Sequence, residues 1–403
     1  MSRTPVGKGD NRRTHVNISN RLLTRRAFLG GVAALIAWVL NGCRAAPTPT
    51  EPPTATPAAV PTATPFPTRT PTAVPTATTT AVSTATATPS RPASPLPGPT
   101  ATSSGLRQPA IVKRYPEVKS KVVVTSHAGV WNGERLSPEA LRYMVDASIT
   151  ELTGLNDAQE AWRAIFDPAE TIAIKVNTIA GSRYWTNPLL VMAVTKGLVD
   201  AGIPAGNILI FDRDSGELKG AGFTINRGGP GVRCFGTDGG YSTTKNIGST
   251  TVRLSDLLLR SSALINMSIL KQHDISGFTF ALKNHYGTIR DPGALHGGYA
   301  DPYIGQLNAL PDIRDRTRLI IGDALKICPR DWDHAVKENT ILVSFDPVAH
   351  DRVAMDILAA RAQALGLNPN AITGKARQLA TAARLGVGTN DLANIEKKAL
   401  VLS

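Results

Sequence analysis

The stretch between Asn266 and His296 holds the densest group of side chains able to do chemistry. Its polar members are Lys271, His273, Lys283, Asn284, His285 and His296. Lysine neutralises carboxylate or phosphate groups, and histidine transfers protons near neutral pH. Lysines that lie close together also lower one another's pKa, which can turn one of them into a base. The stretch therefore indicates a site for a small anionic ligand, with Lys271, His273, Lys283 and His296 as catalytic candidates.

A short helix is predicted inside this stretch. Ser276 is typical of an N-cap and Gly287 of the residue that ends a helix, so we expect the helix to run to Tyr286. Its N-terminus would lie beside Lys271 and His273 and would add unpaired backbone N–H groups to an anion site.

Helical spacing divides the side chains of this segment between two faces. One face carries Thr279, Lys283 and Tyr286, and the other carries Phe278, Leu282 and His285. Because the second face is mostly apolar, we expect His285 to pack in the core or to support the site from behind. We expect Lys283 to be a functional cation.

Polar side chains also follow the apolar runs that we predict as strands. Lys175 and Asn177 share one face at the end of the run 171–177 because side chains alternate along a strand. Other strand ends carry Asp212-Arg213, Asn266, Asp323 and Asp346. Because loops are generally polar, one polar residue after a strand needs no further explanation. Several polar strand ends that face one crevice, however, indicate a binding site. The binding candidates are Lys175, Asn177, Asp212, Arg213, Asn266 and Asn284.

The elements that must position these residues alternate along the chain. Strands are predicted over residues 121–125, 171–176, 208–211, 263–266, 318–321 and 341–344, and helices over 138–152, 188–201 and 347–365. This order predicts an α/β fold, a mostly parallel sheet flanked by helices. Ligands of such sheets bind beyond the carboxyl ends of the strands, where the binding candidates lie.

Several segments form a combination of motifs that is specific to one family. They are 266–273, 277–287, Leu295-His296, Ile174-Lys175-Val176-Asn177, Asp323 and Asp346-Pro347-Val348-Ala349-His350-Asp351. Together they resemble the signature of the domain of unknown function 362 family, over most of the chain from about Ala161 onward. The resemblance implies no particular reaction. Many members of that family carry a ferredoxin-like iron–sulfur module, which this sequence does not provide.

Three hypotheses remain for the site. In the first, an enzyme binds a small acidic substrate through Lys175, Lys271 and Lys283, and a histidine moves a proton. In the second, a divalent metal is added, with ligands drawn from His273, His296, Asp323, Asp346 and Asp351; this mixed set suits zinc, iron or manganese. In the third, a lipoprotein captures an anion and performs no chemistry.

The N-terminal region predicts export and membrane attachment. Arg25 and Arg26 precede an apolar run of residues 27–40, which is too short for a membrane span, and Leu40-Asn41-Gly42-Cys43 follows. This is a twin-arginine signal peptide over residues 1–42 with a lipid attachment site at Cys43. The predicted partners are the twin-arginine translocase, the lipoprotein-processing enzymes and the outer face of the cell membrane. Residues 43–105 then form a Pro/Thr/Ala-rich linker that cannot bury a core, and residues 106–403 form the globular domain.

Composition excludes two classes of function. The first 44 residues hold eight Lys/Arg and one Asp, a net +7, so the rest of the chain carries +6 of the formal +13, and nucleic-acid binding is not expected. Beyond Cys43 the sequence contains Cys234 and Cys328 and no C-x-x-C pair, so we expect no iron–sulfur cluster. These two cysteines either form one disulfide or are buried thiols.

Overall fold

The structure is a computed structural model that describes residues 106–179, 184–331 and 334–403, all within the compact unit Ala87–Ser403. The predicted signal peptide with Arg25 and Arg26, Cys43 and the linker lie outside the described residues. Among the helices of the described part, none has the length and apolar character to cross a bilayer.

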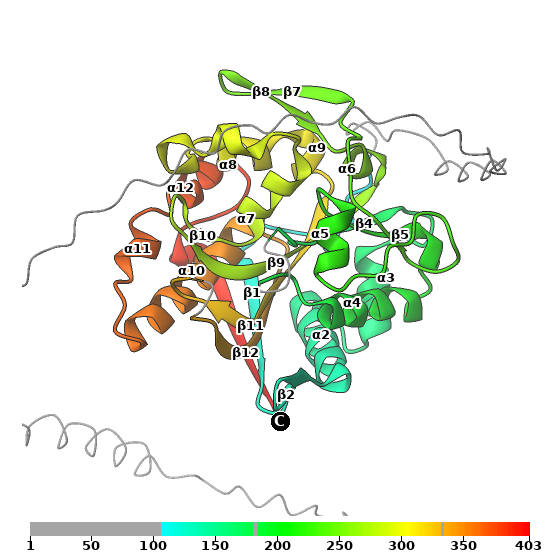
Figure 1. Cartoon of the computed structure of the whole chain (residues 1–403). Helices are drawn as coiled ribbons and strands as arrows, with labels where there is room; N and C mark the ends of the chain where they lie inside the picture. Colours follow the sequence, from blue (N-terminus) through cyan, green and yellow to red (C-terminus); the bar gives the residue numbers. More distant parts are fainter. Residues whose placement is uncertain (1–105, 180–183, 332–333) are drawn as a thin grey trace, which may run out of the picture. The chain divides into compact units, whose positions relative to one another are not determined.

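A mixed sheet, nine-stranded within the described residues, forms the centre of this unit (Figure 1). Its strands in order are β13 (Ile395–Leu402), β1 (Ser120–His127), β12 (Val336–Ser344), β11 (Thr317–Cys328), β9 (Ala263–His273), β4 (Ile172–Lys175), β5 (Ile208–Phe211) and β6 (Arg233–Cys234), and β10 (Gly277–Thr279) pairs with β9. Neighbours run parallel from β11 to β6. The predicted α/β fold with a mostly parallel sheet is confirmed.

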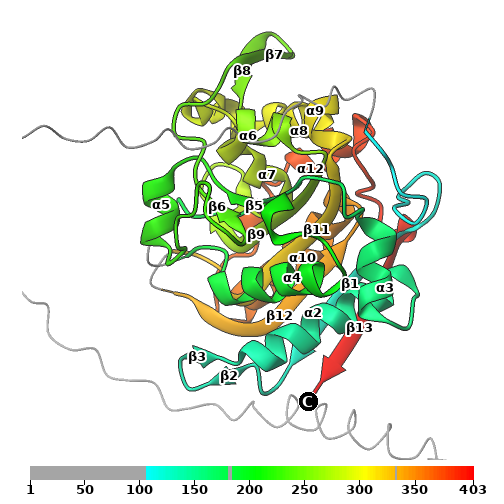
Figure 2. The same ribbon diagram turned by 90° about the vertical axis from the view of Figure 1, so that its right-hand side faces the viewer.

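Helices cover both faces of the sheet, because its strands are buried on both sides. In β4, Ile172 and Ile174 pack into one apolar cluster and Ala173 into the other. The first cluster includes α2 (Pro138–Thr153), α3 (Ala158–Ile165), α4 (Pro188–Asp200) and α5 (Ser215–Gly220), and the second includes α6 (Asp256–Arg260), α7 (Ala281–Asn284), α8 (Tyr303–Ala309), α9 (Pro311–Arg314), α10 (Pro347–Ala364), α11 (Asn370–Thr373) and α12 (Gln378–Arg384). Figure 2 views the sheet from the α2–α4 side and also shows the hairpins β2–β3 (Trp131–Asn132, Arg135–Leu136) and β7–β8 (Thr243–Ile247, Thr250–Leu254).

Local signals in the sequence account for the main helices. Ser137 caps α2 by accepting a hydrogen bond from the Ala140 backbone N–H, and Asn187 caps α4 in the same way. The helix α4 joins the parallel strands β4 and β5, as the βαβ pattern predicts. Cys234 and Cys328 are free, buried thiols.

The strand β12 runs antiparallel to both of its neighbours, which the sequence pattern did not indicate. Its carboxyl end therefore lies at the opposite edge of the sheet from the ends of β4, β5 and β9. Asp346 follows β12, so the expectation that it faces the same crevice as Lys175 is wrong. Its carboxylate caps α10 by accepting hydrogen bonds from the Val348 and Ala349 backbone N–H groups.

The helix predicted from Ser276 to Tyr286 is also wrong in its first half. The strand β9 continues to His273 and pairs antiparallel with β10, so Gly277–Thr279 is extended. Gly277 has a φ of +81°, and a Cβ there would lie 2.2 Å from the Ile372 carbonyl oxygen, so the turn requires glycine. The helical part is shorter, α7 followed by a 3-10 turn over His285–Thr288.

The start of α7 has a partner within the protein. The Asp351 carboxylate accepts hydrogen bonds from the Ala281 and Leu282 backbone N–H groups, each at 2.9 Å. His350 Nδ1 lies 3.0 Å from the same carboxylate. The helix N-terminus proposed for an anionic ligand is thus occupied by Asp351, which holds the site segment against α10.

Candidate functional site

A cavity of about 280 Å³ lies at the carboxyl ends of β4, β5 and β9, which is near the lower end of the usual volume range of ligand pockets. Its lining includes Lys175, Asn177, Asp212, Arg213, Lys271, His273, Lys283, Asn284 and His296. We call it the site cavity. It brings together side chains from three strand ends, α7 and the loop that follows, so residues far apart in the sequence meet there.

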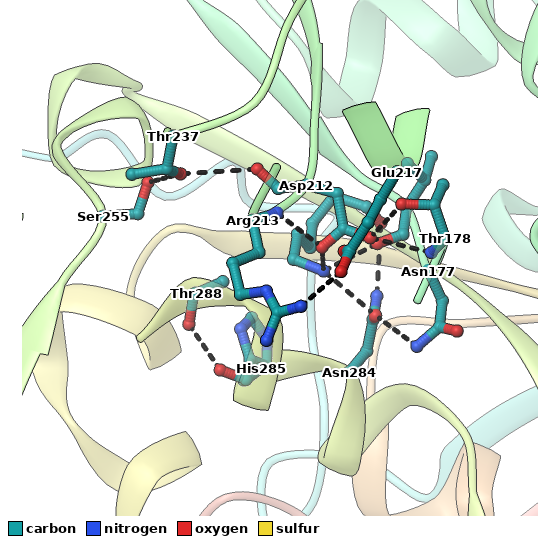
Figure 3. A network of polar contacts seen from close by, with 12 residues as sticks. Asn177, Thr178, Asp212, Arg213, Glu217, Thr237, Ser255, Asn284, His285 and Thr288 are labelled. Carbon is teal, nitrogen blue, oxygen red and sulfur yellow. Dashed lines mark hydrogen bonds and ion pairs between the residues drawn. The ribbon is translucent and has the colours of Figure 1, made fainter. Parts of the chain in front are cut away.

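A buried ion pair forms one wall of the site cavity. Lys175 Nζ lies 2.7 Å from Asp212 Oδ1, and the two side chains are 1% and 5% exposed. Burial lowers the pKa of Lys175, and the adjacent Asp212 carboxylate opposes that shift. Asp212 also accepts hydrogen bonds from the Thr178 backbone N–H and hydroxyl, both at 2.7 Å, and from the Arg213 backbone N–H (Figure 3). The carboxylate is thereby fixed in position.

An amide network lies beside this ion pair, and Asn284 is its centre. Asn284 Oδ1 accepts hydrogen bonds from Lys175 Nζ at 3.2 Å and from Asn177 Nδ2 at 3.4 Å, the second of which is drawn in Figure 3. Its Nδ2 donates to Asn266 Oδ1 at 2.7 Å. Asn266 is fully buried and does not line the site cavity, so it positions Asn284 and contacts no ligand itself.

His285 lies behind this network. It is 1% exposed, and its Nε2 lies 3.2 Å from Asn266 Nδ2. Burial and, to a smaller extent, the charge of Lys175 lower the pKa of His285 to about 3, so the ring is neutral. The structure thus places His285 where it supports the site, as expected from its apolar surroundings.

Lys271 enters the site cavity from the end of β9. Its Nζ donates a hydrogen bond to Asn177 Oδ1 at 3.1 Å, and the residue is 4% exposed. Burial lowers the pKa of Lys271 to about 8, while Asp212 acts in the opposite direction. At neutral pH most of this lysine is therefore charged.

Lys283 enters the site cavity from α7. Its Nζ lies 3.4 Å from His296 Nε2 and 4.7 Å from the centre of the Tyr286 ring. Burial lowers the pKa of Lys283 to about 7, and the neighbouring Lys271 contributes to the shift. About half of this lysine is therefore uncharged at neutral pH.

The two cavity histidines have opposite tautomers, because the Nδ1 atom of His296 faces a backbone carbonyl oxygen and that of His273 faces a backbone N–H group. His296 Nδ1 lies 2.9 Å from the Pro292 carbonyl oxygen and must donate to it, so Nε2 keeps its lone pair. His273 Nδ1 accepts from the Ile275 backbone N–H, so in the neutral ring Nε2 carries the proton. The rings stack with their centroids 5.7 Å apart. Burial lowers the pKa of His273 to about 3 and also lowers that of His296.

Some residues in or directly behind the lining of the site cavity were not named as candidates from the sequence. Thr178 follows Asn177 directly, and its position after a strand end was a usable signal. Glu217 lies in the first turn of α5 and pairs with Arg213. Gly287 was interpreted as a helix end, but a Cβ there would lie 2.5 Å from Lys175 Nζ, so its missing side chain makes room for the ion pair. A single sequence gives no signal of this role, because Lys175 and Asp212 are far from Gly287 along the chain.

The aspartates of the metal hypothesis do not meet the histidines. Asp323 lies inside β11, accepts hydrogen bonds from the Asn187 and Leu325 backbone N–H groups, and lines a separate cavity with Trp131 and Trp185. Asp346 and Asp351 cap α10 and α7. Among the residues that the structure describes, no group of three or more His, Cys, Asp or Glu is arranged to hold a metal ion. The physical reason is that β11 is longer than predicted and β12 runs antiparallel.

Comparison with known proteins identifies the family. Residues 172–356 match the family described as a domain of unknown function (DUF362). The chain carries a DUF362 domain. The DUF362 region extends from β4 into α10 and contains all the charged and histidine side chains that line the site cavity.

Two further comparisons add little to the DUF362 match. A comparison with curated proteins gave no match. Among solved structures, the chain is similar to the lactate racemase apoprotein from Thermoanaerobacterium thermosaccharolyticum, with 13% identity and a TM-score of 0.32. The similarity covers 56% of this chain and 54% of that one, so the chain spans about half the length of that structure.

Proposed function

We propose that the protein is an enzyme that binds a small anionic substrate in the site cavity and moves a proton on it. The observation that supports this most is the excess of buried positive charge. Summed over the side chains of its described lining, the charges of Lys175, Arg213, Lys271 and Lys283 exceed those of Asp212 and Glu217 by two when all are ionised. An anionic group of the substrate offsets this charge, which buried surroundings cannot screen.

Lys271 and Lys283 have different roles in this proposal. Lys271 is held by the Asn177 amide oxygen and is mostly charged at neutral pH, so it binds the anionic group. Lys283 and His296 form the acid–base pair, because their nitrogen atoms face one another and both have pKa values lowered by burial. His273 stays neutral and offers the proton on Nε2 to the substrate as a hydrogen-bond donor.

Calorimetric titration with phosphate, sulfate and acetate tests the binding part of the proposal. Lys271→Ala and Lys283→Ala should each weaken binding, by up to about 2 to 5 kcal/mol where the charge is fully buried. Lys196→Ala is a matched control, because this lysine lies on α4 with a side chain that is 67% exposed. Binding that is equal in all four proteins would refute the anion site.

Proton exchange tests for catalysis whatever reaction the enzyme performs on its substrate. The protein is incubated with small carboxylic acids in deuterated water, and loss of carbon-bound protons is followed by NMR. We expect exchange in the wild type and its loss in His296→Gln, with binding retained. Saturable binding without any exchange would instead support the alternative, a non-catalytic lipoprotein that captures anions.

We further propose that this enzyme is a lipoprotein on the outer face of the cell membrane. The proposal is supported by the sequence alone: the Arg25-Arg26 pair, the apolar run after it, and Cys43 at its end. Its partners would be the twin-arginine translocase, the lipoprotein-processing enzymes and the membrane itself, through lipid on Cys43. The linker would hold the DUF362 region away from the bilayer.

A further inference from the structure

Lys283 is buried near a like charge, which favours its uncharged form, and lies beside a group that can accept its proton. Its Nζ lies beside the lone pair of His296 Nε2 and over the face of the Tyr286 ring. Within the described part of the chain it makes no ion pair, and Lys271 adds a like charge nearby. A lysine amine that is desolvated next to another cationic group becomes a nucleophile near neutral pH.

Lys271 differs from Lys283 in the group that contacts its nitrogen. Its Nζ donates to the Asn177 amide oxygen, which stabilises the ammonium form and is not a base, whereas His296 Nε2 beside Lys283 can take up a proton. The two lysines thus have separable capacities: Lys271 attracts an anion, and Lys283 offers an electron pair in the same cavity.

His296 supplies the proton acceptor that an amine nucleophile requires. The Pro292 carbonyl oxygen holds the proton on Nδ1, so the lone pair on Nε2 faces Lys283 at 3.4 Å. A proton that leaves Lys283 Nζ can therefore pass to His296 Nε2 without a change of tautomer.

Building on the proposed anion site, we propose that the substrate carries an aldehyde or ketone beside its anionic group and that Lys283 forms an imine with this carbonyl. The Nζ electron pair attacks the carbonyl carbon, and His296 Nε2 carries the first of the two Nζ protons to the carbonyl oxygen, which gives a carbinolamine. His296 Nε2 then carries the second Nζ proton to the hydroxyl, the C–O bond breaks, and water leaves as the C=N bond forms. One amine and one carbonyl give one imine and one water, without an oxidant or reductant.

The site cavity has room for a short oxo acid. Its volume of about 280 Å³ admits such a ligand with its carboxylate at Lys271 and its carbonyl at Lys283. Pyruvate is a suitable probe, because it carries both groups. Acetate lacks the ketone, and acetone lacks the carboxylate.

Trapping with borohydride tests the imine. The full chain is incubated with pyruvate and borohydride, its intact mass is measured, and the modified peptide is sequenced. We expect a stable adduct on Lys283, no adduct with acetate, and at least about tenfold less with acetone, because acetone cannot use the charge of Lys271. Lys283→Arg should lose the adduct, and the exposed-lysine control Lys196→Arg should keep it. Peptide sequencing of the wild type locates the adduct even if Lys283→Arg fails to fold.

The outcomes separate this inference from the proposed function. If pyruvate and acetate both bind by calorimetry but no adduct forms, the imine is refuted and the anion site stands. An adduct on Lys271, or one spread over surface lysines, also refutes the imine. If neither acid binds and no adduct forms, the proposed function fails together with the inference.

Discussion

Replacing Asp212 with Asn should lower the free energy of unfolding by about 3 to 5 kcal/mol, because it leaves the Lys175 charge buried without its counter-charge. The 2.7 Å ion pair is almost completely buried, so water cannot replace the carboxylate. Asparagine also has a single acceptor oxygen, whereas Asp212 accepts from Thr178 and Arg213 as well. The Val176 carbonyl oxygen and Asn284 Oδ1 still accept from Lys175, which keeps the loss within this range.

Lys175→Met should cost less, about 1 to 3 kcal/mol, because hydrogen-bond donors still stabilise the Asp212 carboxylate. The double variant should cost at least about 1 kcal/mol less than the sum of the single variants, because it removes both charges together. Urea unfolding followed by tryptophan fluorescence measures all four proteins. Additive effects, or a loss below about 1 kcal/mol for Asp212→Asn, would contradict the assignment of a coupled, buried pair.

The remaining predictions concern titration, packing and anchoring. Between pH 7 and 10 the Lys283 amine has lost its proton in the folded protein, whereas in the unfolded chain it keeps the proton up to its ordinary pKa of 10.5, so this lysine makes the unfolding free energy rise by about 1.4 kcal/mol per pH unit. Lys283→Met should remove this contribution, and an unchanged pH slope in urea unfolding would contradict the prediction. Gly287→Ala should destabilise the fold by about 1 to 3 kcal/mol and weaken acetate binding, because its Cβ would displace the Lys175–Asp212 pair; calorimetry showing wild-type binding would argue against it. Cys43→Ala should release the protein from membranes or block its maturation, and a processed form that still needs detergent for extraction would rule out the lipid anchor.

Much of the fold was predictable because local signals and tertiary structure agree. The capping residues Ser137 and Asn187 and the apolar runs 172–175 and 208–211 correspond to observed elements. The direction of β12 was not predictable, because an apolar run has the same pattern whichever way it crosses the sheet. Asp346 was misplaced for this reason alone.

Site residues could be predicted where they directly follow a strand. They could not be predicted where their position depends on which strands pair with one another. Lys175, Asp212 and Lys271 were assigned to one crevice, and the structure brings them together. The sequence after His273 has helical spacing, yet its first residues, Gly277–Thr279, form a strand because they pair with β9. Thr279 and Lys283 nevertheless reach the same cavity, because the chain turns from β10 directly into α7.

Crystals soaked in selenate, an analogue of sulfate that scatters X-rays anomalously, would show where the protein binds an anion. We expect an anomalous peak inside the site cavity, within hydrogen-bond distance of Lys271 Nζ and Lys283 Nζ, and its loss in the double variant Lys271→Ala/Lys283→Ala. Peaks confined to surface lysines such as Lys196, with none in the site cavity, would contradict this expectation.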